Sequence, residues 1–446
     1  MPSASPRGEP ETGLELMDKI NVGLIGLGTV GEGVARILTG KSKFLEKKIG
    51  AKLALKRVCD KDIRRKRELK LDPSILTTDV NKILNDPEIQ IVVELVGGIR
   101  PAKDFILEAF RQGKSVVTAN KALIAECGEE IFREAKKANV DLYFEAAVGG
   151  GIPIIKALRE SLGANHIDTL LGIVNGTSNY ILSAMADEGL SFSQALAEAQ
   201  KKGYAERDPS LDIKGGDSAH KLAILALLGF GRSVDLKDIY TEGIEDVSLS
   251  DIEYARDFGY VIKLLAIAKN IGGKLEARVH PTLLSKEHLL SNVRGVYNGI
   301  YVHGDFVGGT LFYGRGAGSR PAASSVAGDI IDVARNIKYN CVNRVPVYVP
   351  DETIKGLRDI SGIETRYYLR LSVVDKPGGL AGIAAILGKH NISIASVVQK
   401  ERKQAKIVPV VMMTHDCREK DMRLALGEIN RMGMIRKKTV ALRVER

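Results

Sequence analysis

The stretch INVGLIGLGTVGEGVARIL, residues 20–38, decides the fold, because an apolar strand leads directly into a glycine loop and then into a helical pattern. The loop Gly26-Leu27-Gly28-Thr29-Val30-Gly31 has the spacing G-x-G-x-x-G. The first glycine permits a tight turn, the second lets a pyrophosphate approach the backbone, and the third allows close packing of helix on strand. The phosphates then lie at the helix N-terminus, where free N–H groups favour anions. The sequence therefore predicts dinucleotide binding at Gly26, Gly28, Thr29, Val30 and Gly31.

Strand-like and helical segments alternate after this loop as far as residue 148. Further apolar runs occupy residues 51–60, 89–98, 114–120 and 140–148, and helical patterns between them include 31–48, 101–112 and 127–138. This alternation is typical of right-handed βαβ units in a parallel sheet covered on both faces. We expect an α/β fold whose residues 19–148 form a Rossmann-type dinucleotide-binding domain, completed by part of 318–345.

The choice between NAD and NADP stays open. Asp60 ends the second predicted strand, where a carboxylate accepts hydrogen bonds from a ribose 2′-OH and disfavours a 2′-phosphate. It slightly favours NAD. Lys61 and the run Arg64-Arg65-Lys66-Arg67 follow at once and would suit a 2′-phosphate, although a solvated helix face is the more ordinary interpretation of such a run.

Charge marks a separate C-terminal module. The chain of 446 residues has a net charge of +10, and the segment 366–446 holds 17 basic and 7 acidic residues, so it carries the whole excess. The polar start, residues 1–18, is expected to be a flexible tail, and 346–364 a linker. The four cysteines are scattered and no apolar run is long enough for a membrane, which predicts a cytoplasmic protein with no membrane partner.

Residues 149–345 are predicted to be an α+β substrate-binding, catalytic and dimerisation domain. Its expected elements are a strand at 166–174, helices at 178–187, 191–202, 216–229 and about 253–270, a strand near 274–280, and a helix from Pro321 to about Asn336.

A lysine occupies an unusual place in the helix GDSAHKLAILALLG, residues 216–229. Asp217 and Lys221 are four apart and share one face, and from Leu222 onward the helix is apolar all round, as in a buried helix. The pair is either a surface ion pair at the helix start or an acid/base group held at a cleft. The loop just before it, 203–212, carries several carboxylates and suggests recognition of a cationic substrate group.

Three motifs resemble those of homoserine dehydrogenases over nearly the whole chain: VTANKALIA (117–125), EAAVGGGIPII (145–155), and GIVNGTSNYI with GYAERDPSLDIKGGDSAHKLAIL downstream. The resemblance implies NAD(P)-dependent interconversion of L-homoserine and L-aspartate 4-semialdehyde in threonine, methionine and isoleucine biosynthesis. Two alternatives remain: another NAD(P)-dependent dehydrogenase of a small amino-acid aldehyde, and a non-catalytic NAD-sensing regulator.

The resemblance also implies residue roles. Lys221 would give a proton to the developing alkoxide, and Asp217 would assist it. The implied substrate-binding residues are Glu206, which would hold the α-ammonium, and Asp212, Tyr204, Thr177 and Lys121. Lys121 would also contact the cofactor, and Gly203 and Gly318 are the implied positions at its nicotinamide end. The implied ligands of a monovalent cation, sodium, are Glu145, Val148, Gly150 and Ile152, although AVGGG can simply be a turn between domains.

The C-terminal module, residues 365–446, is predicted to be βαββαβ, a ferredoxin-like order. Its turn Asp375-Lys376-Pro377-Gly378-Gly379-Leu380 resembles that of ACT domains, which implies an amino-acid effector, threonine, near Asp375, Gly378, Gly379 and Leu380. RNA binding ranks low, because the candidate central strands have aromatic residues only at Tyr367 and Tyr368. A purely dimerising module is the third interpretation. The resemblance implies a homodimer or homotetramer and no nucleic-acid partner.

Overall fold

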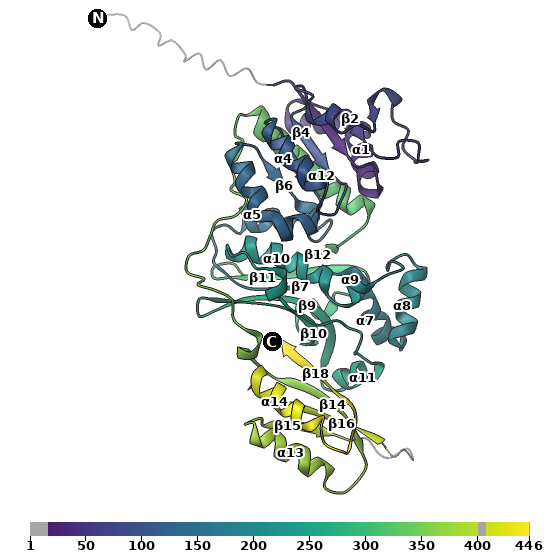
Figure 1. The fold of residues 1–446 in the computed structure, drawn as a ribbon, viewed down its shortest axis with the longest axis vertical. Coiled ribbons are helices and arrows are strands. Elements are labelled where there is room, and N and C mark those ends of the chain that lie inside the picture. The colour runs from purple at the N-terminus through teal and green to yellow at the C-terminus, as the bar shows by residue number, and fades with distance from the viewer. Residues whose placement is uncertain (1–16, 400–406, 446) are drawn as a thin grey trace, which may run out of the picture.

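The computed structural model describes residues 17–399 and 407–445 and arranges them as three bodies along one long axis (Figure 1). A parallel sheet with its helices lies at one end, a mixed sheet lies in the middle, and a small α/β module lies at the other end. Most of the predicted flexible tail, residues 1–16, lies outside the described residues. Within the described ranges, no helix combines the length and the apolar character needed to cross a membrane.

The first body is built on a six-stranded parallel sheet. Its strands are β1 (Lys19–Ile25), β2 (Lys52–Cys59), β3 (Leu76–Thr77), β4 (Ile91–Glu94), β5 (Ser115–Thr118) and β6 (Leu142–Tyr143). The spatial order is β3-β2-β1-β4-β5-β6, and every neighbouring pair is parallel. β4 and β5 are buried at every position, as expected for strands covered on both faces. The order reverses beside β1, so the predicted Rossmann-type fold is confirmed.

A helix from much later in the chain completes this body. Its helices are α1 (Thr29–Gly40), α2 (Ser42–Ile49), α3 (Asn81–Leu84), α4 (Ala102–Arg111), α5 (Lys121–Lys137) and α12 (Ser319–Lys338). α12, green among the purple and blue elements of Figure 1, packs against α1. The Oγ of Ser319 donates a hydrogen bond of 2.7 Å to the carbonyl of Thr29. The start of α12 therefore lies directly beside the glycine loop.

The middle body is a mixed sheet with helices on one side. Its own strands are β7 (Ile167–Ile173), β8 (Tyr240–Thr241), β9 (Tyr260–Ile271), β10 (Lys274–Ser285), β11 (Tyr297–Gly304) and β12 (Gly308–Arg315). Its helices are α6 (Ile154–Lys156), α7 (Gly176–Glu188), α8 (Phe192–Lys201), α9 (Ser210–Ile213), α10 (Gly216–Phe230) and α11 (Leu249–Asp257). α10 packs against β7, β9 and β10, and it also contacts α5 of the first body. It is thus the buried helix that the sequence predicts.

The predicted helix at about 253–270 is wrong. α11 ends at Asp257, Gly259 adopts a positive φ of 83°, and the chain continues as the twelve-residue strand β9. β9 lies between β7 and β10 in the sheet, and residues 262–268 are buried on both faces. A strand covered on both faces has no apolar–polar alternation, so its apolar run resembles that of a buried helix.

The C-terminal module has the predicted βαββαβ order. Its elements are β14 (Tyr367–Val374), α13 (Gly379–Lys389), β15 (Ile394–Val398), β16 (Ile407–Thr414), α14 (Glu419–Ile429) and β18 (Ile435–Glu445). The strand order is β18-β14-β16-β15, so the first and third strands of the module are central, and the ferredoxin-like prediction is confirmed. A short pair, β13 (Glu364–Thr365) with β17 (Cys417–Arg418), flanks it.

The module and the middle body share one sheet. The end of β18 pairs in parallel with β10, which joins the two into a ten-stranded sheet. Buried ion pairs reinforce this joint: the guanidinium of Arg370 donates to both carboxylate oxygens of Asp251 at 2.6 and 3.0 Å, and the hydroxyl of Tyr368 donates to Oδ1 at 2.9 Å. Arg443 donates to Glu419 at 2.6 and 2.8 Å and to Glu242 at 2.9 and 3.3 Å. The sequence indicated no such continuity.

Candidate active site

The glycine loop has the geometry that a dinucleotide requires. Gly26 has φ of 97°, and a side chain there would lie 2.7 Å from the carbonyl oxygen of Leu95. A side chain at Gly31 would lie 2.1 Å from the carbonyl oxygen of Gly26. At Gly28, by contrast, the space that a side chain would take is empty. The loop thus combines two tight packing points with one open approach to the backbone.

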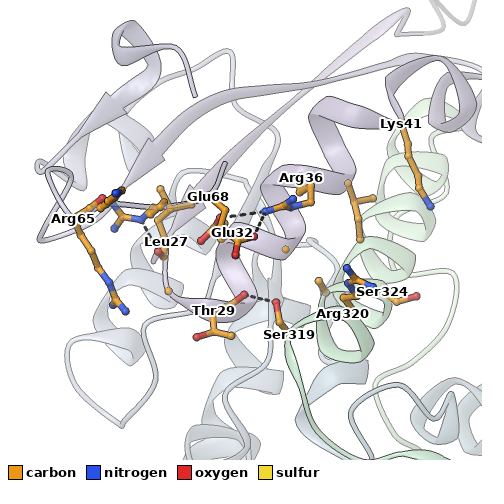
Figure 2. A pocket seen from close by; sticks show the side chains of 16 residues that line it. Leu27, Thr29, Glu32, Arg36, Lys41, Arg65, Glu68, Ser319, Arg320 and Ser324 are labelled. Atoms are coloured by element: carbon orange, nitrogen blue, oxygen red, sulfur yellow. Dashed lines mark hydrogen bonds and ion pairs between the residues drawn. The ribbon is translucent and has the colours of Figure 1, made fainter. Parts of the chain in front are cut away.

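A cavity of about 780 Å³ opens at this loop (Figure 2). Gly28 and Thr29 line it from the loop, and Ser319 and Ser324 line it from α12. The basic residues that line it are Arg36, Lys41, Arg65, Lys66, Arg67 and Arg320. Such a surplus of positive charge beside a helix N-terminus suits the phosphates of a dinucleotide.

Asp60 holds the loop in place. Its Oδ2 accepts the N–H of Leu27 at 2.6 Å, and its Oδ1 lies 3.3 Å from the guanidinium of Arg67. Arg67 in turn donates to the carbonyl of Leu27 at 3.0 Å. Residues 61–70 form turns and contain no helix, so the interpretation of the basic run as a solvated helix face is wrong. The local turns bring Arg65 and Lys66 to the cavity instead.

Lys221 and Asp217 form a buried pair at the start of α10. The ammonium of Lys221 lies 2.7 Å from Oδ2 of Asp217 and donates to the carbonyl of Val174 at 2.6 Å. Only 10% of the Lys221 side chain and 6% of the Asp217 side chain are exposed, which excludes the solvated surface pair. Lys121, at the start of α5, lies 3.1 Å from Oδ1 of Asp217. The two oxygens of one carboxylate therefore face two lysines, one from each body.

The electrostatics of this cluster favour an ionised Asp217. Burial alone would raise the pKa of its carboxyl group. The positive charges of Lys221 and Lys121 and the hydrogen bonds from Lys221 and Asn175 lower the same pKa, and their combined effect is larger than that of burial. The net effect holds the pKa of Asp217 well below its usual range. Asp217 is thus a fixed negative charge beside the ammonium of Lys221.

Asn175 joins the acidic loop to this cluster. Its Nδ2 donates to Oδ1 of Asp212 at 2.7 Å and to Oδ2 of Asp217 at 2.8 Å. Thr177, two residues on, donates from Oγ1 to the carbonyl of Tyr204 at 2.7 Å. The predicted substrate residues Asp212, Thr177 and Tyr204 are therefore tied to the Lys221 cluster. Asn175 was not predicted; its place before the helix of 178–187 signalled an N-cap and nothing more.

Three of the predicted site residues lie outside the cluster of Lys221 and Asp217. Glu206 is exposed on the loop, and within the described residues its carboxylate makes no hydrogen bond or ion pair with the cluster. Gly203 is exposed after α8. Gly318 precedes α12 and so adjoins the cofactor loop through Ser319.

The predicted cation residues lie where the chain crosses from β6 to the middle body. The carboxylate of Glu145 accepts the N–H groups of Ile155 and Lys156, both at 2.8 Å, and the carbonyl of Gly150 accepts Ser325 Oγ at 2.7 Å. Within the described residues, no group of three or more His, Cys, Asp or Glu side chains is arranged for a metal ion. The main-chain carbonyls of this turn are hard oxygen donors, which is the kind of ligand that a monovalent cation takes.

The predicted effector residues surround the start of α13. Gly378 has φ of 86° and precedes the helix, Gly379 begins it, and Leu380 is exposed on its first turn. Asp375 lies in the turn between β14 and α13. The free N–H groups of this helix start suit a carboxylate.

The fold and the site together define an NAD(P)-dependent oxidoreductase with a C-terminal regulatory-type module. Three family models match: the NAD-binding domain of homoserine dehydrogenase at residues 26–145, homoserine dehydrogenase at 153–331, and the ACT domain at 367–433. A homoserine dehydrogenase from Synechocystis is 45% identical over 435 residues, which are 95% of this chain and 99% of the relative. The chain belongs to the homoserine dehydrogenase family.

Solved structures agree with this assignment. The crystal structure of a homoserine dehydrogenase from Thiobacillus denitrificans has a TM-score of 0.88 and 43% identity, and the match covers 96% of this chain and 99% of that one. A hyperthermophilic archaeal homoserine dehydrogenase in complex with NADPH has a TM-score of 0.61 and 29% identity, over 71% of this chain and 97% of that one. The fold, the family and the oxidoreductase class are thus as the sequence predicted.

Proposed function

We propose that Lys221 is the acid/base group of this homoserine dehydrogenase and that Asp217 fixes its position. The observation that carries the proposal is the buried cluster in which Asp217 contacts both Lys221 and Lys121. The nicotinamide supplies or accepts the hydride when bound. Lys221 donates a proton to the oxygen of the semialdehyde as that oxygen gains charge, and in the reverse direction it accepts the proton of the homoserine hydroxyl.

The acidic loop and Lys121 hold the substrate in this proposal. Homoserine carries an ammonium and a carboxylate at one end, and these groups need opposite partners. The exposed carboxylate of Glu206 is free to take the ammonium, with Asp212, Thr177 and Tyr204 shaping the loop. Lys121 approaches from the first body, and its ammonium, which lies 3.1 Å from Asp217 and stays partly exposed, takes the carboxylate end. Two such contacts place the reacting carbon beside the nicotinamide end of the cofactor near Gly203 and Gly318.

The cofactor cavity supports NADP as well as NAD. The carboxylate of Asp60 is already occupied by Leu27 and Arg67, so it opposes a 2′-phosphate less than a free carboxylate would. Arg65 and Lys66 line the same cavity and offer positive charge to a phosphate. The NADPH held by the archaeal relative is consistent with this choice.

In the proposed domain organisation, residues 19–148 with α12 form the cofactor domain, 149–345 the catalytic and dimerisation domain, and 346–364 the linker.

A sodium ion at Glu145, Val148, Gly150 and Ile152 would have a structural role, because this turn connects the cofactor domain to the catalytic domain. Its carbonyl oxygens and the Glu145 carboxylate would hold the ion. Two buried carboxyl groups support the proposal, since the N–H of Glu145 donates to Asp329 at 2.8 Å and a nearby cation would offset both acids. Replacing Na⁺ by a large organic cation should lower the thermal unfolding midpoint; an unchanged midpoint contradicts the site.

The C-terminal module is proposed to bind threonine as a feedback effector at Asp375, Gly378, Gly379 and Leu380. A homodimer or homotetramer fits the family, and the four free cysteines support a reducing compartment, the cytoplasm.

One assay tests the catalytic and regulatory proposals together. Steady-state oxidation of L-homoserine is measured with NAD⁺ and with NADP⁺, each with and without threonine. We expect turnover with both coenzymes and inhibition by threonine. If neither NAD⁺ nor NADP⁺ supports turnover, the proposed reaction is contradicted. If turnover occurs but threonine does not change it, only the proposal that threonine is the effector is contradicted.

A further inference from the structure

Asn175 occupies the turn between β7 and α7, next to the proposed catalytic pair. It is 5% exposed. Its Nδ2 donates to Asp212 at 2.7 Å and to Asp217 at 2.8 Å, and its Oδ1 accepts the N–H of Ser178 at 2.8 Å. Both amide protons and the amide oxygen are therefore used, in a fully satisfied buried network.

The chemistry of this position is restrictive. Asp212 and Asp217 both present carboxylate oxygens, and two ionised carboxylates cannot donate to one another. The group between them must offer two hydrogen-bond donors at a short distance from one backbone position. A lysine or arginine would do so but would add a third positive charge to those of Lys221 and Lys121. The side-chain amide of asparagine supplies both donors and stays neutral.

The same turn also holds the lysine. The carbonyl of Val174 accepts Lys221 Nζ at 2.6 Å, and the neighbouring Asn175 holds the carboxylate that pairs with it at 2.7 Å. Two consecutive residues at the end of one central strand thus fix both members of the pair. Asp212 connects the turn to the acidic loop, because its side chain meets Asn175 and its carbonyl accepts Ser178 Oγ at 2.9 Å.

We propose that Asn175 is a positioning residue, whose amide couples the substrate-binding loop at Asp212 to the catalytic pair Asp217 and Lys221. This inference rests on the proposed function, since it needs Lys221 and Asp217 to be the catalytic pair. Reaction rates are sensitive to such placement: a displacement of about 1 Å costs on the order of 100-fold. Side chains that orient a metal ligand through a hydrogen bond contribute about 10- to 100-fold to affinity or activity, and we expect an effect of similar size here.

An ordinary structural role is separable from this one. Asn175 is also the N-cap of α7, and the cap uses Oδ1 whereas the bridge uses Nδ2. Asn175→Asp keeps the size and the capping oxygen, because aspartate is as good an N-cap as asparagine. It removes both donors and introduces a carboxyl group that faces Asp212 on α9, Asp217 and Lys221 on α10, and Lys121 on α5. Asn175→Ser keeps a capping oxygen, but it offers a single O–H donor on a shorter side chain.

The experiment measures L-homoserine oxidation with NADP⁺ by the full chain from pH 6 to pH 10. For Asn175→Asp we expect kcat about 10- to 100-fold below wild type at pH 9, with the KM for NADP⁺ unchanged. The deficit should shrink toward pH 6, since the introduced carboxyl group between two acids takes up a proton and regains one O–H donor. Ser191→Ala, which removes the N-cap of α8, is the control for loss of a cap alone and should leave the pH profile unchanged.

Wild-type kcat and pH profile in Asn175→Asp would overturn the proposal and leave Asn175 a helix cap. If that variant unfolds at a much lower temperature than wild type, Asn175→Ser is used instead, and a kcat at the wild-type level there overturns the proposal equally. Lys221→Ala is assayed in parallel. Near-normal turnover in Lys221→Ala rejects the catalytic pair itself, whereas an inactive Lys221→Ala beside a normal Asn175→Asp rejects only the role of Asn175.

Discussion

At the scale of single residues, the site depends on a few charged side chains that are held in buried or partly buried positions by hydrogen bonds and opposite charges. Asp217 is buried yet ionised, because two lysines and an amide compensate the cost of burial. Removing either Lys221 or Lys121 would leave the buried carboxylate of Asp217 poorly paired. Asp60 in the cofactor loop is held in the same way, by the backbone N–H groups of Leu27 and Asp62 and by Arg67. Each acid is thus fixed before any ligand binds.

In our proposal, the preference for NADP over NAD depends on two residues of the cavity wall, Arg65 and Lys66. Replacing both Arg65 and Lys66 by alanine should raise the KM for NADP⁺ by about 10-fold or more, because a hydrogen bond to a charged group contributes about 1.5–3 kcal/mol. The KM for NAD⁺ should change little, since NAD lacks the 2′-phosphate. Lys47→Ala, on the exposed face of α2, is the control. An equal rise with both coenzymes would assign these side chains to a part that the two molecules share.

At the scale of elements, agreement with the sequence depended on how local the signal was. The glycine loop and the βα alternation are local patterns, and they predicted the parallel sheet and Rossmann-type fold. β9 was mistaken for a helix because burial on both faces removes the alternation. Asn175 could not be recognised because its partners Asp212 and Asp217 are 37 and 42 residues away along the chain. Only the folded arrangement of β7, α9 and α10 brings these three together.

β9 also contains a charge that the sequence pattern did not explain. Lys263 is 4% exposed, and its ammonium donates to Asn179 Oδ1 at 3.1 Å and to the carbonyl of Val293. Burial, assisted by the charge of Arg294 and opposed by that of Asp187, lowers the pKa of Lys263 to about 8. Below pH 8 the folded protein must therefore keep a poorly solvated ammonium in the sheet.

Lys263→Met tests this effect. Between pH 8 and about 10.4 the unfolded lysine keeps its proton while the folded one has lost it, so wild-type stability rises with pH over that window. Methionine does not titrate. The difference in the free energy of unfolding, wild type minus Lys263→Met, should therefore increase by roughly 3 kcal/mol as the pH rises from 7 to 10.5. A difference that does not change with pH in urea unfolding contradicts the lowered pKa.

At the scale of the whole molecule, the ten-stranded sheet makes the regulatory module continuous with the catalytic body. β18 pairs with β10, and Asp251 of α11 meets Arg370 and Tyr368 of β14. Asp251 is fully buried. The ACT domain is therefore joined to the catalytic body by paired strands and by a buried ion pair, and not by the segment 346–364 alone.

Asp251→Ala should weaken this joint. Removing one partner of a buried ion pair costs about 3–5 kcal/mol, because the remaining charge of Arg370 is left without compensation. We expect a lower thermal unfolding midpoint and weaker inhibition by threonine. Asp104→Ala, which removes a long and exposed ion pair with Arg100, is the control and should change stability by about 0–1 kcal/mol. Equal midpoints for the two variants contradict the importance of the joint.

The most direct test of the account is the turnover of Lys221→Ala beside its affinity for NADPH. General acid–base groups contribute about 10²- to 10⁴-fold, so kcat for L-homoserine oxidation should fall by that factor while the Kd for NADPH, read by fluorescence, stays within about twofold of wild type. Lys237→Ala, at an exposed lysine, should behave as wild type in both measurements. If Lys221→Ala keeps a kcat close to that of wild type, the buried pair of α10 is not the catalytic centre.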